Sequence, residues 1–130
     1  MADMSIQQII KNEFANNPVP GVNSAEEYAY YLKQLLQTDY KMIHSGNYLF
    51  VYKEIGNGVV EIDVLEGKKS DKDLLESLFK ALLEIRQAGY KEANIPFDDE
   101  RMIGFFKKLP ALPVSFEQVE DVYVAKVRLA

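Results

Sequence analysis

The sequence contains no cysteine, no tryptophan and a single histidine. The absence of cysteine excludes a disulfide framework, a thiolate metal site and a cysteine nucleophile. The one histidine, His44, stands in a predicted strand with no serine and no second metal ligand at motif spacing, so we expect a structural or surface role for it. No HExxH, Walker or nucleophile-elbow motif occurs, and we predict no metal site.

Long apolar runs are missing as well. No run approaches the roughly 18 to 20 residues that a membrane-spanning helix needs. The first residues also lack the basic start and the apolar block of a secretory signal. We therefore expect a cytoplasmic protein with no membrane partner.

Positive charge is in deficit, because 15 Lys and Arg stand against 20 Asp and Glu, which gives a net charge of −5. Affinity for nucleic acid depends mainly on clustered Lys and Arg. We therefore expect no nucleic-acid partner, and any other polyanionic ligand would need a local positive site.

The residues that are present suit one domain. The chain has 130 residues, of which 48% are hydrophobic, and this is enough to bury a core without metals or disulfides. We find no internal repeat, low-complexity tract or interdomain linker. Residues 1–130 are therefore expected to form a single domain.

Two helices are predicted before the first strand. Ser24 and Glu27 are spaced as a capping box, and the apolar residues that follow have helical spacing up to position 37. These apolar residues are Tyr28, Tyr31, Leu32, Leu35 and Leu36. Residues 6–14 fit a helix better than a strand, although residues 5–7 would also fit an edge strand, and residues 16–21 break the chain.

The period of the apolar residues changes to two after Asp39. Three short extended runs follow, at residues 40–44, 48–54 and 59–65, and the glycine-containing segments 45–47 and 56–58 separate them. This pattern predicts an antiparallel meander.

The local signals agree best over residues 71–88. Ser70 and Asp73 can form a capping box, and Gly89 stands where a left-handed C-cap is expected. The apolar face of this predicted helix comprises Leu74, Leu75, Leu78, Phe79, Leu82, Leu83 and Ile85.

Residues 90–97 are predicted to form a strand that is reached through a long helical crossover, so this strand should lie parallel to residues 59–65. A helix capped by Asp98 or Asp99 follows and is stopped by Pro110, and strands at 114–119 and 122–129 turn at 120–121. The apolar residues of this helix are Met102, Ile103, Phe105, Phe106 and Leu109. The sequence therefore predicts an α/β (α+β) fold, with a mixed, mostly antiparallel sheet flanked by helices.

This order of elements resembles that of the GNAT acetyltransferase family over roughly residues 40–129. Members of the family carry the pattern Arg/Gln-x-x-Gly-x-Gly/Ala before a helix that begins with a leucine pair. Alignment on Leu74 and Leu75 places residues 66–71 over that loop, and residues 99–109 resemble the family's Asn-x-x-Ala-x-x-x-Tyr-x-x-Leu-Gly-Phe segment.

The resemblance implies a site for acetyl-CoA or CoA. In the family, the loop amides and the start of the long helix hold the CoA pyrophosphate, because several N–H groups and the helix dipole converge there. The resemblance places this role on Gly67, Lys68, Lys69, Ser70, Asp71 and Lys72.

Several positions depart from the family pattern. Glu66 replaces the first Arg/Gln, Lys69 and Asp71 replace the two glycines, and Asp73 adds a carboxylate. Read without the resemblance, Ser70, Asp71 and Asp73 are ordinary residues of a helix start. Phe106 stands where the family often has a tyrosine that protonates the departing thiolate, and a phenyl ring has no proton to give.

Glu61 and Asp63 project from the same face of a predicted strand. If the strand borders an acceptor site, as the resemblance implies, one of these carboxylates would act as general base. The alternative is a solvent-facing strand surface. Tyr30 lies off the apolar face of its helix and suits either a binding contact or simple exposure.

Three functions remain open. We expect a GNAT-like protein that has lost standard acetyltransferase activity and serves as a binding or interaction module for an unknown protein partner, such as an accessory protein of a phage or bacterium. The alternative is an acyl-CoA-dependent N-acetyltransferase with an atypical phosphate loop, acting on a small amine acceptor. An unrelated α/β interaction domain is the third. Pairing of edge strands would give a homodimer.

Overall fold

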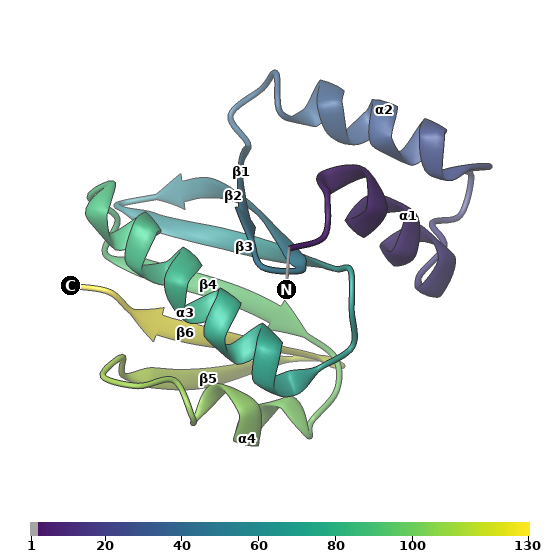
Figure 1. Cartoon of the computed structure of the whole chain (residues 1–130). Coiled ribbons are helices and arrows are strands. Elements are labelled where there is room, and N and C mark those ends of the chain that lie inside the picture. Colours follow the sequence, from purple (N-terminus) through teal and green to yellow (C-terminus); the bar gives the residue numbers. More distant parts are fainter. Residues whose placement is uncertain (1–2) are drawn as a thin grey trace.

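The computed structural model describes residues 3–130 as one sheet with helices on both faces (Figure 1). In chain order, the elements are α1 (Ile6–Asn16), α2 (Ala25–Leu35), β1 (Lys41–Ser45), β2 (Tyr48–Gly56), β3 (Val59–Glu66), α3 (Asp71–Gln87), β4 (Glu92–Phe97), α4 (Met102–Phe106), β5 (Val114–Val119) and β6 (Val122–Arg128). No helix in this part of the chain is both long enough and apolar enough to cross a bilayer.

The six strands are arranged in the order β1-β2-β3-β4-β6-β5. All neighbouring pairs are antiparallel except β3 and β4, which are parallel because α3 crosses over the sheet between them. The predicted fold class, the meander and the parallel strand after the long helix are therefore confirmed.

The two faces of the sheet are covered differently. On one face, α3 and α4 pack over the main core, which includes Tyr48, Phe50 and Tyr52 of β2. On the other face, α1 and α2 pack over a smaller core that includes Leu49 and Val51. Because both faces of β2 are covered, its first five residues are all buried. Within the described residues, the smaller core includes none from β4, β5 or β6, so this half of the second face stays open.

Most helix boundaries follow the local signals. Residues 6–16 are helical, so the edge-strand alternative was wrong. Ser24 Oγ accepts the N–H of Glu27 at 3.1 Å, and Ser70 Oγ accepts the N–H of Asp73 at 3.4 Å. Gly89, just after α3, has a φ of +101° and so occupies the left-handed region that favours glycine.

Two expectations require correction. The helix before Pro110 spans only five residues and has no side-chain cap, because the Asp99 carboxylate binds the N–H of Arg101 (3.0 Å) within the preceding turn. On α2, Tyr31 and Leu35 are 50% and 37% exposed. The reason is that α2 packs mainly on α1, whose own contacts reach the sheet, so only a narrow stripe of α2 is covered.

The N-terminal helix is also tied to the connection between β3 and α3. Asn12 Nδ2 donates to the carbonyl oxygen of Gly67 at 2.9 Å, and Glu13 Oε2 accepts the N–H of Glu66 at 3.1 Å. Gly67 itself is buried at this contact. A Cβ atom at position 67 would lie 2.6 Å from the carbonyl oxygen of Asn47 and 2.8 Å from Cγ1 of Ile9.

We therefore predict that Gly67→Ala destabilises the protein by about 1–3 kcal/mol, the usual cost of forcing an extra group into a packed site. Gly104→Ala is the matched control, because a Cβ there meets nothing within 4 Å and alanine favours the helix. Urea unfolding measures both variants. Equal midpoints for the two variants would contradict the packing described for Gly67.

Candidate functional site in the gap between β3 and β4

The parallel pair of strands separates before either strand ends. Pairing joins Val59–Glu61 to Glu92–Asn94, although β3 continues to Glu66 and β4 to Phe97. Beyond the last pair lies a cavity of about 250 Å³. Its lining residues are Asp63, Val64, Glu66, Leu74, Leu78, Ile95, Pro96, Phe97, Met102, Phe105 and Phe106.

The backbone of β3 offers an amide to this gap. Gly67 donates its N–H to the carbonyl oxygen of Asn47 at 2.8 Å, on the β2 side of the sheet. Because backbone groups alternate along a strand, the N–H groups of Val64 and Glu66 point towards β4. The Glu66 N–H is taken by Glu13, which leaves the Val64 N–H facing the gap. An amide in this position can bind a carbonyl oxygen.

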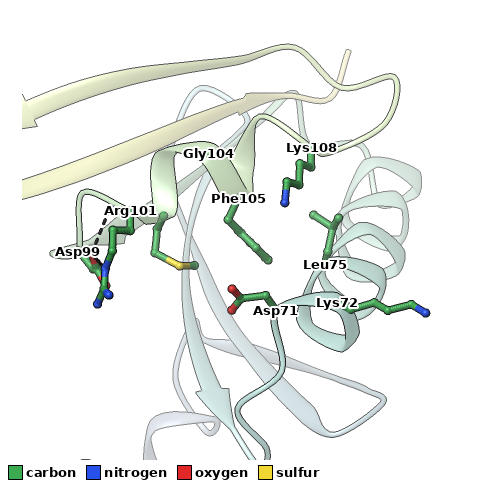
Figure 2. Close-up of a pocket in the computed structure, with 9 residues that line it drawn as sticks. Asp71, Lys72, Leu75, Asp99, Arg101, Gly104, Phe105 and Lys108 are labelled. Atoms are coloured by element: carbon green, nitrogen blue, oxygen red, sulfur yellow. Dashed lines mark hydrogen bonds and ion pairs between the residues drawn. The ribbon is translucent and has the colours of Figure 1, made fainter.

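A larger cavity of about 840 Å³ lies beside the start of α3 (Figure 2). Its lining residues are Asp71, Lys72, Leu75, Asp99, Arg101, Met102, Gly104, Phe105 and Lys108. Met102 and Phe105 line both cavities, so the two cavities adjoin at these side chains. Figure 2 shows the Asp71 carboxylate pointing into this space towards Phe105, whereas Lys72 extends away from it.

Two of the nearby cations are held by carboxylates. Lys68 Nζ lies 3.1 Å from Asp73 Oδ2, and the Arg101 guanidinium lies 2.9 Å from Asp99 Oδ2. The hydrogen bonds from the Arg101 side chain lower the pKa of Asp99. Both pairs are exposed and contribute little to stability. The pair of Arg101 and Asp99 lines the larger cavity and reduces the positive charge offered to an anion there, whereas Lys68 and Asp73 line a separate cavity.

Of the predicted phosphate loop, Asp71 and Lys72 line the larger cavity, whereas Lys68 lines a separate cavity. Gly67 has its N–H and its carbonyl oxygen engaged by Asn47 and Asn12, and the Ser70 hydroxyl caps α3. Lys68 and Lys69 are exposed. The amides of Asp71 and Lys72, in the first turn of α3, are those that the helix leaves without an internal partner. The binding of a cofactor by residues 67–72 stays a prediction.

The two predicted general bases occupy different places. Asp63 lines the gap. Glu61 lies two residues earlier on the same face of β3, in the last residue pair with β4, opposite Asn94. Although Asp63 as a residue is exposed, burial of its carboxyl group raises its pKa. Burial, followed by the charge of Glu13, also raises the pKa of Glu66. Of the two candidates, Asp63 is therefore better placed to act on a ligand in the gap.

Phe106 lies at the inner wall of the gap. It is 3% exposed, and its ring centroid is 5.0 Å from that of Phe97 and 5.2 Å from that of Phe105. The position that the family alignment gives to a tyrosine is thus part of an aromatic cluster. Within the described residues, no group of three or more His, Cys, Asp or Glu side chains is arranged to hold a metal ion.

Sequence reasoning placed Glu66 at the start of the predicted phosphate loop, but it did not identify Val64 or Phe97 as lining residues. Their involvement depends on where β3 and β4 separate. Pro96 was the available signal, because proline has no N–H to donate to a neighbouring strand.

No protein-family model matches the sequence, and no curated protein matches it. Thirteen chains of solved structures do match the fold. A probable acetyltransferase of the GNAT family from Chromobacterium violaceum is 13% identical, with a TM-score of 0.66 and coverage of 94% of this chain and 80% of that chain.

Two ligand-bound structures are also similar. A phosphinothricin acetyltransferase from Sinorhizobium meliloti in complex with AcCoA is 11% identical, with a TM-score of 0.61 and coverage of 98% of this chain and 85% of that chain. An acetyltransferase from Bacillus subtilis in complex with CoA is 7% identical, with a TM-score of 0.58 and coverage of 97% and 93%. The chain therefore has a GNAT-like fold, and at such identities the likeness shows the fold alone.

A buried tyrosine of β2 forms a hydrogen bond to the residue before α3 and so contributes to the stability of the fold at the site. The Tyr48 hydroxyl donates to the carbonyl oxygen of Ser70 at 3.0 Å, and burial, followed by the charges of Asp73 and Glu66, raises the pKa of Tyr48 to about 12. Its pKa in the unfolded chain is about 10. The stability that the neutral phenol contributes is therefore complete below about pH 10 and is lost as the pH rises towards about 12.

We predict that Tyr48→Phe lowers the free energy of unfolding at pH 7 by about 0.5–1.5 kcal/mol, because the hydrogen bond is lost. The difference from wild type should shrink between about pH 10 and 12, since the variant lacks this titration. Denaturant titrations across that range measure it, with Tyr30→Phe as the control for removing an exposed phenol. Parallel curves for wild type and Tyr48→Phe above pH 10 would contradict the assignment.

Proposed function

We propose that this chain is a GNAT-like binding or interaction module of the cytoplasm that lacks standard acetyltransferase activity. The observation that carries the proposal is the negative charge where the family binds the CoA pyrophosphate. Asp71 points into the larger cavity, and Asp73 holds Lys68 in an ion pair at 3.1 Å. Carboxylates stabilise the start of a helix, as a bound phosphate does, because the helix dipole is positive there. Asp71 and Asp73 therefore already interact with this dipole, and their charges repel a pyrophosphate.

The aromatic cluster supports the same proposal. Phe106 has no acidic proton, and its ring packs against Phe97 and Phe105. A departing thiolate would therefore have to be protonated by another group.

The partner that we propose is a protein, contacted through the outer surface of α2. Tyr30 and Tyr31 are 57% and 50% exposed, and their ring centroids lie 5.8 Å apart. Neighbouring exposed tyrosines are enriched in protein interfaces because each ring offers a large apolar area and a polar end. An accessory protein of a phage or bacterium would use such a surface, and a homodimer through an edge strand is compatible with it.

The second candidate function is an acyl-CoA-dependent N-acetyltransferase that acts on a small amine. The gap between β3 and β4 favours it, because the Val64 amide faces this gap and Asp63 lines its rim. A carboxyl group whose pKa is raised by burial accepts an ammonium proton more readily than an ordinary one.

We predict that wild-type protein binds acetyl-CoA and CoA at millimolar concentration or more weakly in isothermal titration. The double variant Asp71→Gly/Asp73→Ala should bind about tenfold more tightly, or by about 1.4 kcal/mol, because two repelling carboxylates are removed and Lys68 is released. Glu26→Ala/Glu84→Ala is the matched control, since both residues are exposed, on α2 and near the end of α3, and neither lines any of the cavities described above. Circular dichroism monitors the helix in each variant.

Release of free thiol from acetyl-CoA in the presence of a panel of small amines distinguishes the two functions. The proposal predicts no release above the rate without protein. Turnover by wild type that Asp63→Asn abolishes and Glu61→Gln leaves unchanged would establish the acetyltransferase instead. Micromolar, salt-sensitive binding of acetyl-CoA by wild type would also count against the proposal.

A further inference from the structure

The polar contacts of α1 are concentrated on the connection that leads from the gap to α3. Asn12 binds the carbonyl oxygen of Gly67 at 2.9 Å, and Glu13 binds the N–H of Glu66 at 3.1 Å. Gln8 supports the first contact, because its Nε2 donates to Asn12 Oδ1 at 2.8 Å. These contacts span more than 50 residues of sequence and join the small core under α1 to the site.

The group that occupies the Glu66 amide is an anion. Val64 and Glu66 are the two residues near the end of β3 whose N–H groups point towards β4, and the carboxylate of Glu13 already takes the second. A carboxylate oxygen and the oxygen of an acyl or phosphate group are the same kind of acceptor for a backbone N–H. Glu13 therefore fills from within a position that an anionic or carbonyl ligand would use.

The hydrogen bond between Glu13 and the Glu66 N–H lies close to other ionisable groups. The charge of Glu13 contributes to the raised pKa values of both Glu66 and Tyr28, so it lies close to both groups. Asp63 also faces Tyr28. Glu13 is thus held near the Glu66 carboxylate by hydrogen bonds from the Glu66 N–H and, at 3.3 Å, from Asn17 Nδ2.

Glu13 belongs to the layer of α1 and α2, which has a smaller core than the layer of α3 and α4. Its core is small, and Ile6, Tyr30, Tyr31 and Leu35 of its helices remain exposed by 37–57%. Regions with few buried apolar contacts open locally before the whole fold unfolds. The α1 layer is therefore the part of the fold expected to open before the α3 core.

We propose that α1 is an autoinhibitory clamp on the gap between β3 and β4, in which Glu13 occupies the Glu66 amide and Asn12 holds the Gly67 carbonyl until an anionic ligand displaces them. Displacement frees the Glu66 N–H beside that of Val64 and loosens residues 66–70, so that an anionic ligand can enter the gap. The clamp regulates the gap between β3 and β4, so its purpose rests on ligand binding there, the basis of the second candidate function above. The contact itself is measurable without a ligand.

The first test is amide hydrogen exchange by NMR on the protein without ligand. Glu13→Ala should raise the exchange rates of the Glu66 and Gly67 amides about tenfold or more, the effect expected for the loss of a hydrogen bond to a charged group. Asn12→Ala should act in the same direction. Glu26→Ala removes the same charge from an exposed position on α2 and should leave these rates unchanged.

Amides of the α3 core, such as those of Leu78 and Ile85, separate a clamp from general destabilisation. They should keep their wild-type rates in Glu13→Ala. Equal acceleration there, or an unchanged Glu66 rate, overturns the proposal. Glu13→Gln keeps an acceptor without the charge, and it should give an intermediate rate even if Glu13→Ala folds poorly.

The second test is titration with CoA in two backgrounds, wild type and Asp71→Gly/Asp73→Ala. Adding Glu13→Ala should tighten CoA binding about tenfold where binding is measurable, and adding Glu26→Ala should not. If Glu13→Ala leaves the CoA affinity unchanged in both backgrounds, the proposal that α1 is a clamp is overturned. Tight binding by the wild type alone contradicts the proposed function but not the clamp, since the clamp is judged by the ratio between variants.

Discussion

The early separation of β3 from β4 is the constraint on which the site depends. Only three residue pairs join the strands, from Val59 to Glu61 on one side and from Glu92 to Asn94 on the other. If the pairing continued in the same register to Val64 and Phe97, it would consume the Val64 amide and close the cavity. The strands can stay apart because each is paired on its other edge, β3 with β2 and β4 with β6, so neither depends on the parallel contact for its stability.

The side chains around the gap between β3 and β4 decide which ligands it suits. On the α3 side, the Phe97 ring packs against Phe106 and stacks on Tyr123 with centroids 5.4 Å apart, which makes the inner wall apolar. On the other side and at the α3 end, carboxylates gather at Asp63, Glu66 and Asp71. In a chain with a net charge of −5, the gap is thus shaped for an extended ligand but charged against a polyanionic one.

The sequence predicted the elements whose signals are local. For α3, the cap at Ser70, the apolar period and Gly89 all lie within the helix or next to it, and the observed helix differs from the predicted one by a single residue. The strands of the meander were found for the same reason. The prediction that Asp98 or Asp99 caps α4 was wrong. The Asp99 carboxylate accepts a hydrogen bond from the Arg101 N–H within the preceding turn, and this bond competes with capping.

The parts that could not be predicted depend on contacts between distant segments. The exposure of Tyr31 follows from α2 lying on α1 and not flat on the sheet, which no helical period reveals. The cavity follows from the length of a parallel pair, and the hydrogen bond between Glu13 and Glu66 joins residues 53 positions apart. Residue type alone gave Asp63 and Glu61 equal standing, and only the separation of the strands placed Asp63 at the gap.

Gly67 illustrates how one residue type can have two physical causes. In the family pattern, the loop glycines let a phosphate approach the backbone, and those positions hold Lys69 and Asp71 here. Gly67 stands two residues before the first of them, and the atoms that a Cβ would meet there belong to Asn47, Ile9 and Met4. The close approach at Gly67 is therefore made by the β1–β2 turn and by the N-terminal segment of the same chain. A glycine in this loop is thus evidence for close approach but not for the nature of the group that approaches.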